Sequence, residues 1–213
     1  MLKSEVCVNG LVTRTAVAKT NSEGKSFVTF GLRTDTPYVT DLRTVLDISV
    51  SLDGEDTAGI EQNARVEVKG VLTFKKRGDK IYLNLHASEV NLNPASATDM
   101  ISGTLTFRGT LGKTIDSKTD KKGNPYLLFS GYSSEKVEES FEYTWVRFVH
   151  FGENELIKPQ AKLEITGGLE LSVYKEKLNI SCRISEVKEW IRQSQSPETS
   201  EFREQSSTDE CPL

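Results

Sequence analysis

Long apolar runs are absent from the 213-residue sequence, and no window approaches the roughly eighteen consecutive apolar residues that a membrane helix requires. The first ten residues include Glu5 where a secretory signal would be apolar, so we expect a cytoplasmic protein. Cysteine and histidine are also scarce. Cys7, Cys182, Cys211 and two histidines cannot supply a closely spaced zinc quartet or an even disulfide framework. We therefore expect no metal, no cofactor and no membrane association.

Catalytic signatures are missing as well. The sequence contains no GxSxG nucleophile elbow, no HExxH zinc-protease pair and no GxxxxGKS or GxxxxGKT phosphate loop. His86 and His150 stand alone inside strand-like patterns, where a packed or solvated imidazole is the simpler interpretation. Cys7 and Cys182 lie in apolar strand contexts and are expected to be inert core thiols. The sequence therefore favours a binding protein over an enzyme.

Charge is nearly balanced over most of the chain, although the net charge is -4. Residues 1–93 hold 12 basic and 12 acidic side chains, and residues 94–190 hold 13 and 14. Residues 191–213 hold 2 basic and 5 acidic side chains, so most of the excess lies in this tail. Two near-neutral bodies can still carry local basic stripes, because a binding groove responds to nearby charge rather than to the total.

An internal repeat organises the sequence. Residues 6–32 align with residues 105–131 at a constant offset of 99, and residues 64–90 align with residues 161–187 at an offset of 97, both without a gap. Average composition would give roughly one or two identities in each window. The observed identities include Gly10 with Gly109, Gly24 with Gly123, Gly70 with Gly167, and the run Ser88, Glu89, Val90 with Ser185, Glu186, Val187. The chain is therefore a tandem duplication.

Within each unit the hydrophobic period is two, as in residues 65–69 and 162–165, and clusters of Gly, Asn, Asp and Ser separate the alternating segments. This pattern predicts short strands joined by hairpins. Two stretches, residues 57–62 and 153–157, could form a small helix between strands. Five strands with at most one small helix are typical of the closed OB-fold barrel.

We therefore predict an all-β protein with two tandem OB-fold domains of five strands each, at residues 1–93 and 99–190. Gly70 and Gly167 fall inside strand patterns, where a barrel strand must bend sharply. Residues 191–213 are polar and lack apolar periodicity, so we expect a disordered acidic tail.

One motif in the second unit is specific. Residues 144–152 read TWVRFVHFG, and this order of Trp, Arg, Phe and Gly resembles the third-strand motif of bacterial single-stranded DNA-binding proteins. Residues 123–129 resemble the glycine-led second strand of that family, and Gly167 to Leu169 with Tyr174 resemble its fourth strand, which ends in an aromatic residue. The resemblance spans residues 103–190. It implies two OB-folds that bind single-stranded DNA in the cytoplasm, at the nucleoid.

The strand pattern places Trp145, Arg147 and Phe151 on one face, and Phe148 on the other. Aromatic rings on an open strand face suit single-stranded nucleic acid, because bases stack on them while a guanidinium meets phosphate or base. The resemblance implies that Trp145, Phe151 and Tyr174 stack on bases. The alternative is that Trp145 and Phe151 belong to the core and Phe148 faces solvent.

Basic residues gather near two hairpins, which are expected to be the loops by which OB-folds hold nucleic acid. Lysines there could follow a phosphate backbone without reading sequence, although exposed turns are commonly charged for solubility alone. The candidate phosphate-binding residues are Lys113, Lys118, Lys121 and Lys122 in the second unit and Lys75, Lys76 and Arg77 in the first.

The first unit departs from the motif. At an offset of 100, Val45 and Ser51 stand where the second unit has Trp145 and Phe151, so two stacking platforms are missing. We expect the second barrel to bind DNA more tightly, with the first supplying assembly surface or weaker contacts.

The last five residues, Asp209, Glu210, Cys211, Pro212 and Leu213, resemble the acidic, proline-containing tip by which the same family docks partner proteins, with leucine in place of phenylalanine. Such a peptide offers an apolar anchor, a carboxylate and flanking acids to a basic-rimmed pocket. An arbitrary acidic terminus is the alternative.

The sequence thus predicts a protein that binds single-stranded DNA with little sequence preference, protects it in replication, recombination or repair, and recruits replication and repair proteins through this tip. The family resemblance implies a homodimer, because relatives with two barrels in each chain pair. The rival interpretation is an OB-fold adaptor of a replication or restart complex with little DNA affinity of its own. RNA binding is a third possibility.

Overall fold

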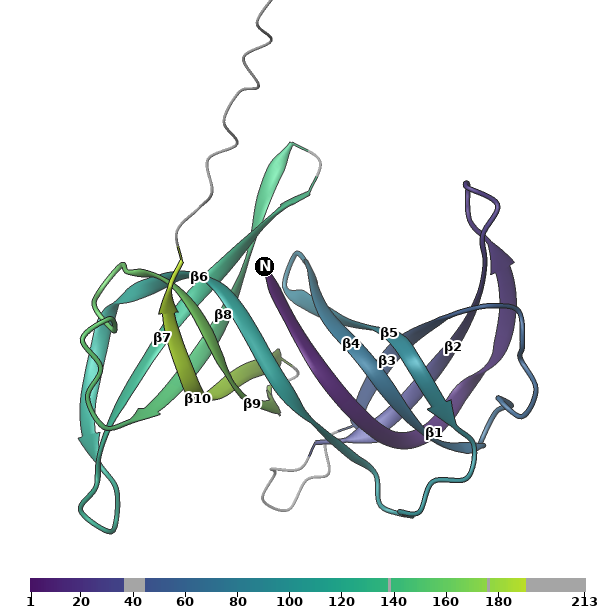
Figure 1. The fold of residues 1–213 in the computed structure, drawn as a ribbon, viewed down its shortest axis with the longest axis horizontal. Helices are drawn as coiled ribbons and strands as arrows, with labels where there is room; N and C mark the ends of the chain where they lie inside the picture. Colours follow the sequence, from purple (N-terminus) through teal and green to yellow (C-terminus); the bar gives the residue numbers. More distant parts are fainter. Residues whose placement is uncertain (37–44, 138, 176, 191–213) are drawn as a thin grey trace, which may run out of the picture.

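Two sets of five β-strands make up the protein (Figure 1). The computed structural model describes residues 1–36, 45–137, 139–175 and 177–190. The first set comprises β1 (Leu2–Thr20), β2 (Ser26–Asp35), β3 (Val45–Asp53), β4 (Arg65–Arg77) and β5 (Lys80–Asn91). The second set comprises β6 (Met100–Thr119), β7 (Pro125–Val137), β8 (Ser140–Phe151), β9 (Lys162–Tyr174) and β10 (Lys177–Glu189). No helix long and apolar enough to span a membrane occurs in these ranges.

Each set closes into a barrel. Strand β1 pairs with β2 and with β4, β2 pairs with β3, and β4 pairs with β5. A parallel pairing of β3 with β5 completes the ring, and the second set repeats the pattern with β8 parallel to β10. Five strands in this closed order are the OB-fold topology. The predicted all-β architecture of two tandem OB-folds is confirmed.

Strands β1 and β6 join the two barrels into one continuous sheet. They pair antiparallel from Leu2 with Phe107 to Asn9 with Met100. At the centre of this ladder Glu5 pairs with Thr104, and these residues are equivalent in the sequence repeat at its offset of 99. Because each strand pairs with its own counterpart in reverse direction, the two barrels are related by an approximate two-fold axis.

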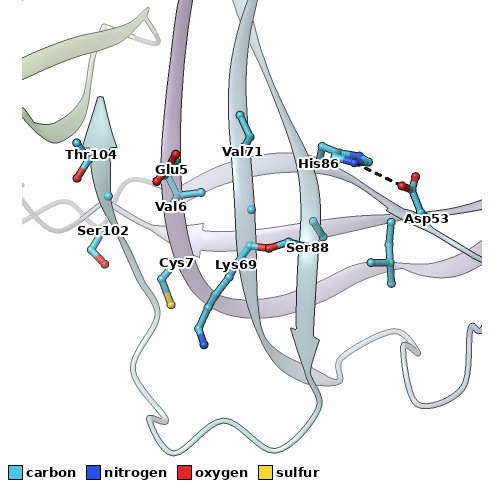
Figure 2. Close-up of a pocket in the computed structure, with 14 residues that line it drawn as sticks. Glu5, Val6, Cys7, Asp53, Lys69, Val71, His86, Ser88, Ser102 and Thr104 are labelled. Carbon is cyan, nitrogen blue, oxygen red and sulfur yellow. Dashed lines mark hydrogen bonds and ion pairs between the residues drawn. The ribbon is translucent and has the colours of Figure 1, made fainter. Parts of the chain in front are cut away.

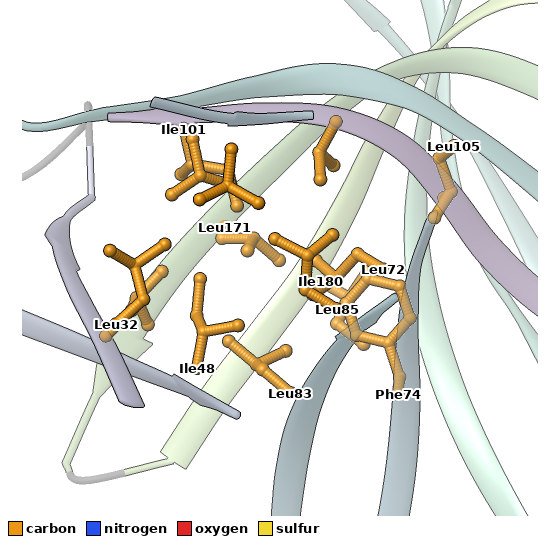
Figure 3. Packing of buried hydrophobic residues seen from close by; sticks show 14 of the residues in the cluster. Leu32, Ile48, Leu72, Phe74, Leu83, Leu85, Ile101, Leu105, Leu171 and Ile180 are labelled. Carbon is orange, nitrogen blue, oxygen red and sulfur yellow. The ribbon is translucent and has the colours of Figure 1, made fainter. Parts of the chain in front are cut away.

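Alternating side chains fill both barrels, and Figure 3 shows apolar residues of the two units in one buried cluster. Phe30 and Leu32 of β2 are fully buried in the first barrel. In the second barrel, Phe107 and Phe148 meet edge to face with ring centroids 4.9 Å apart. Buried aromatic pairs of this geometry add about 0.5–1.5 kcal/mol beyond their apolar area. This packing fixes which face of β8 points outward.

The two stretches that could have been helical are turns. The amide of Ile60 donates to the carbonyl of Thr57 at 3.2 Å, and the amide of Ile157 donates to the carbonyl of Asn154 at 3.1 Å. Each bond closes a single turn. The carbonyl of Ile60 then accepts from the amide of Ala16 in β1 at 2.9 Å, which uses a group that a helix would need. The described residues contain no helix.

Gly70 and Gly167 lie at register shifts, where the backbone of the neighbouring strand, β5 or β10, comes very close to the glycine. A Cβ at Gly167 would lie 2.1 Å from the carbonyl oxygen of Arg183, and one at Gly70 would lie 2.1 Å from that of His86. The bulges fall at Ser185 and Ser88, a repeated pair of the sequence. The missing side chain therefore permits a close backbone approach at the bend.

Candidate nucleic-acid interface

The outward face of β8 carries large aromatic side chains. Trp145 is 53% exposed and Phe151 is 43% exposed, whereas Val146 and Phe148 between them are buried. Phe148 belongs to the core because it packs against Phe107. The alternative interpretation, in which Trp145 and Phe151 are core residues and Phe148 is exposed, is wrong. The barrel interior is already filled, so these two rings are left at the surface.

Tyrosines of β7 and β8 extend this face. Tyr132 is the cross-strand partner of Trp145, with ring centroids 5.2 Å apart, and lies 5.5 Å from the ring of Tyr143. Tyr126 is the partner of Phe151, at 5.8 Å. We call Tyr126, Tyr132, Tyr143, Trp145 and Phe151 the aromatic row.

Sequence reasoning missed the three tyrosines of the row. Their signal was available, because Tyr126 and Tyr132 are six apart on β7, as Trp145 and Phe151 are on β8. The register between the two strands, which brings the rings together, comes only from the structure.

Two arginines lie along the row. Arg147 is exposed on β8 between Trp145 and Phe151, and its cross-strand partner on β7 is Ser130. Arg183 of β10 lies over the ring of Phe151, with its guanidinium carbon 5.2 Å from the ring centroid. A guanidinium on an aromatic face can stack on a further base or pair with a phosphate. The arginines therefore place positive charge beside the flat surfaces.

A groove of about 310 Å³ runs beside Trp145. The second barrel lines it with Trp145 and Arg147 of β8 and with Leu178 and Asn179 of β10. The first barrel contributes as well, because Lys76 and Ile81 of the β4–β5 hairpin also line the groove. The site is therefore composite, and its aromatic side belongs to the second barrel.

Tyr174 stands apart from the row. It is 67% exposed at the end of β9, and the ammonium group of Lys175 lies 5.4 Å from its ring centroid. In the described part of the chain, no ring contact joins Tyr174 to Trp145 or Phe151. Its stacking role stays a prediction.

The basic residues of the second unit lie partly on strand and partly on loop. Lys113 and Lys118 belong to β6, which continues to Thr119, and this differs from the expected position on a loop. Lys121 and Lys122 lie in the β6–β7 turn and are exposed, as are Lys113 and Lys118. The strand is longer than expected because β6 and β7 pair as far as Thr119 with Pro125.

Asp120 organises this turn. Its carboxylate accepts hydrogen bonds from the amides of Lys122 and Asn124, both at 2.8 Å, and from the Asn124 side chain at 3.0 Å. The side-chain and backbone bonds from Asn124 lower the pKa of Asp120. Asn21, the equivalent residue of the first unit, accepts from the amides of Glu23 and Lys25 at 2.9 Å. The repeat thus keeps the turn and changes its charge.

The basic residues of the first unit lie at the end of β4, also on strand rather than loop. Lys75 and Arg77 are exposed, whereas Lys76 points toward the second barrel and its ammonium group lies 3.9 Å from the carboxylate of Glu142. Lys177 of β10 lies 3.5 Å from Asp79 in the β4–β5 turn. Two ion pairs therefore bridge the barrels at this hairpin.

The equivalent face of the first barrel is polar. Asp47 pairs with Arg33 at 3.1 Å, and the hydroxyl of Ser51 lies 3.3 Å from Nδ1 of His86. Val45 is exposed where the second barrel has Trp145. Tyr82 of β5 is 50% exposed and lines a hollow together with Asp47. The two barrels therefore present different chemistry.

No family model and no curated protein matches the chain, but solved structures do. A deletion mutant of the single-stranded DNA-binding protein from Thermus aquaticus matches with a TM-score of 0.50 and 14% identity, over 92% of this chain and 97% of that chain. The chain has the fold of the Thermus aquaticus protein. The resemblance predicted from the sequence is thus confirmed at the level of the fold.

Shorter proteins match one part of the chain. The small single-stranded DNA-binding protein from Streptomyces coelicolor is 18% identical, with a TM-score of 0.35, over 46% of this chain and 97% of that chain. The protein priB from Ralstonia solanacearum is 19% identical, with a TM-score of 0.32, over 41% of this chain and 97% of that chain.

Another hollow, of about 800 Å³, lies elsewhere (Figure 2). It spreads over strands of the first barrel and β6, with Glu5, Lys69, His86 and Ser102 among its lining residues. The described lining contains no tryptophan, tyrosine or phenylalanine. It therefore lacks the stacking surfaces that the smaller groove beside Trp145 has.

The two described cysteines differ. Cys182 is buried, and burial raises its pKa to about 12, which agrees with an inert core thiol. Cys7 is only half-buried and borders the hollow of Figure 2, so its assignment to the core is wrong. The side chain of Cys7 takes an outward position on β1, because its neighbours Val6 and Val8 take the inward positions. Partial burial still raises the pKa of Cys7.

The predicted tip, residues 209–213, lies outside the described residues.

Proposed function

We propose that the protein binds single-stranded DNA with little sequence preference, by stacking bases on the aromatic row of the second barrel. The observation that carries the proposal is the row itself: five rings on adjacent strands, with Trp145 and Phe151 exposed and Arg147 and Arg183 beside them. Stacking contributes about 1–3 kcal/mol for each base and accepts any base, because every base has a flat face.

Phosphate contacts are proposed for the basic residues in and beside the β6–β7 and β4–β5 turns. Lys113 and Lys118 lie on β6 and Lys121 and Lys122 in the β6–β7 turn, and all four are exposed, whereas Lys75, Lys76 and Arg77 end β4 of the first barrel. Contacts of this kind position the strand without reading its sequence, and they release counterions. Binding is therefore expected to weaken as salt rises.

A fluorescence titration tests the proposal. The Trp190→Phe variant leaves Trp145 as the sole tryptophan, since the sequence has two. Addition of oligo-dT is expected to quench its emission, with a dissociation constant that rises steeply with salt. The matching dA·dT duplex should quench far less, because paired bases hide their faces. An emission that oligo-dT leaves unchanged at low salt contradicts the proposal, and equal affinity for oligo-rU would extend it to RNA.

The wider role follows the predicted tail and assembly. We propose that the protein coats single-stranded DNA during replication, recombination or repair, as a homodimer, and that residues 209–213 recruit replication and repair proteins. A chain without these five residues should bind oligo-dT as before and lose binding to such an enzyme. Sedimentation of the full chain measures the assembly, and a monomer at micromolar concentration contradicts the homodimer.

A protein-binding adaptor is the second candidate, and the polar face of the first barrel favours it. There Asp47 is paired with Arg33, and Val45 replaces the tryptophan. Such a face has no tryptophan on which a base could stack, whereas a protein surface can match its paired charges. The oligo-dT titration separates the candidates, because an adaptor alone leaves Trp145 unquenched.

A further inference from the structure

The groove beside Trp145 is built by both barrels. The β4–β5 hairpin of the first barrel points toward the second barrel in Figure 1, and Lys76 and Ile81 of this hairpin line the groove together with Trp145 and Arg147 of β8. Its volume of about 310 Å³ is near the lower end of the roughly 300–1,000 Å³ found for small-ligand sites. Aromatic, aliphatic and cationic side chains therefore converge at one point between the barrels.

Lys76 is not free in this groove. Its ammonium group faces the carboxylate of Glu142 at 3.9 Å, and the two side chains are 31% and 29% exposed. Glu142 belongs to the strand that carries Trp145 and pairs across to Glu135 of β7. A carboxylate therefore occupies the position beside Lys76 that an incoming phosphate would take.

We propose that one nucleotide of the bound strand lies in this groove and contacts both barrels. Its base lies between Trp145 and Ile81, and its phosphate replaces the Glu142 carboxylate as the partner of the Lys76 ammonium group. The proposal rests on the proposed function and adds the site at which the strand crosses from one barrel to the other. The observations that favour this occupant are the positive charge of Lys76 and Arg147 and the continuity of the groove with the aromatic row.

Replacement of the Lys76–Glu142 ion pair by a Lys76–phosphate contact predicts opposite effects on DNA affinity for substitutions at Glu142 and at Lys76. Glu142 competes with phosphate for the same ammonium, so Glu142→Gln is expected to tighten oligo-dT binding about threefold at low salt and to steepen its salt dependence. Lys76→Ala is expected to weaken binding about fivefold and to make the slope of log K against log salt shallower by about 0.7. In the Lys76→Ala background, Glu142→Gln should bring no gain, because the cation that it frees is gone.

A matched pair elsewhere in the first barrel controls for overall charge. Lys69 and Glu89 form an ion pair at 3.1 Å, and neither residue lines the groove. Lys69→Ala and Glu89→Gln make the same charge changes at that distant position. They are expected to leave oligo-dT affinity within about twofold of the parent chain.

The measurement is fluorescence anisotropy of labelled oligo-dT with the full chain at several salt concentrations, after circular dichroism has shown that each variant is folded. Glu142→Gln removes no packing, so the test stands even where Lys76→Ala unfolds. Equal effects of Glu142→Gln and Glu89→Gln, or a gain that persists without Lys76, overturn the proposal. If oligo-dT does not bind, or binds without Trp145, the proposed function itself fails. Binding that needs Trp145 but treats both ion pairs alike overturns this inference only.

Discussion

Trp145 and Tyr132 face each other across β8 and β7 with their ring centroids 5.2 Å apart and their planes tilted by 55°. A ring held by a neighbour loses little side-chain freedom when a base stacks on it, so less of the stacking energy is spent on ordering. Tyr132 in turn contacts Tyr143, which extends the support along the strand. The row is therefore a preformed platform.

Removal of the indole tests this platform. Trp145→Ala is expected to weaken oligo-dT binding about 5- to 150-fold, which corresponds to the roughly 1–3 kcal/mol of one stacked base. Trp145→Phe should retain part of the affinity, because a smaller flat face remains. Fluorescence anisotropy with labelled oligo-dT measures both. If the affinity of Trp145→Ala equals that of the parent chain, Trp145 has no stacking role.

Tyr132 should act through Trp145. Tyr132→Ala is expected to weaken binding less than Trp145→Ala does, and the double substitution should weaken it by less than the product of the single effects. Anisotropy titrations of the three variants give this coupling directly. Independent effects that multiply would mean that Tyr132 does not support the indole.

The structural features that the sequence alone predicts are those that depend on local patterns along the chain. Period-two alternation and filled barrels place Phe148 inside and Trp145 outside, as the structure does. The repeat also predicts which residues share a position, such as Ser88 and Ser185 at the two bulges. These features depend on neighbours along the chain, which a single sequence reveals.

What the sequence could not reveal depends on contacts between distant segments. The register of β7 against β8 brings Tyr132 to Trp145, and the β1–β6 ladder brings Lys76 to Glu142. Strand length also depends on the partner strand, which is why Lys113 lies on β6 rather than on a loop. Cys7 was misassigned because its apolar neighbours, not the thiol, take the inward positions.

Two adjacent glycines give a matched test of the close backbone approach at the bulge. Gly167→Ala places a methyl group 2.1 Å from the Arg183 carbonyl oxygen, so the strands must shift, and a loss of about 1–3 kcal/mol in unfolding free energy is expected. At Gly168 no atom lies within 4 Å of the added Cβ, so Gly168→Ala should stay within about 0.5 kcal/mol. Urea unfolding measures both. Equal stabilities would contradict the steric account.

The β6–β7 turn offers a charge test with its geometry preserved. Asp120 carries a negative charge at neutral pH, close in sequence to Lys118, Lys121 and Lys122, and its hydrogen bonds lower its pKa further. Asp120→Asn should retain the turn, because Asn21 makes the equivalent bonds in the first unit. We expect binding to oligo-dT to tighten on the order of twofold at low salt and the difference to vanish at high salt. Tighter binding that persists at high salt would contradict a purely electrostatic effect.

Thiol alkylation tests the contrast between the two described cysteines. In a Cys211→Ser background at pH 7.5, iodoacetamide is expected to label Cys7 slowly and to leave Cys182 unmodified, because the thiolate is the reactive species. Both pKa values are raised by burial, so protonated thiol dominates at neutral pH, and the rate at Cys7 should rise about tenfold for each pH unit below its pKa. Mass spectrometry locates the label. Labelling of Cys182 in the folded protein would contradict its burial.

The two barrels are expected to contribute unequally to binding. Tyr82 is an exposed aromatic residue of the first barrel and lines a hollow with Asp47, whose carboxylate is already paired with Arg33. Val45 pairs across to Asp35, whereas Trp145 pairs across to a tyrosine, so the first barrel has no supported ring at this position. Tyr82→Ala should therefore change oligo-dT affinity by less than about threefold, far below the effect of Trp145→Ala, in the same anisotropy assay. A loss as large as that of Trp145→Ala would mean that DNA also stacks on the first barrel, and the polar face around Asp47 would then have to lie outside its path.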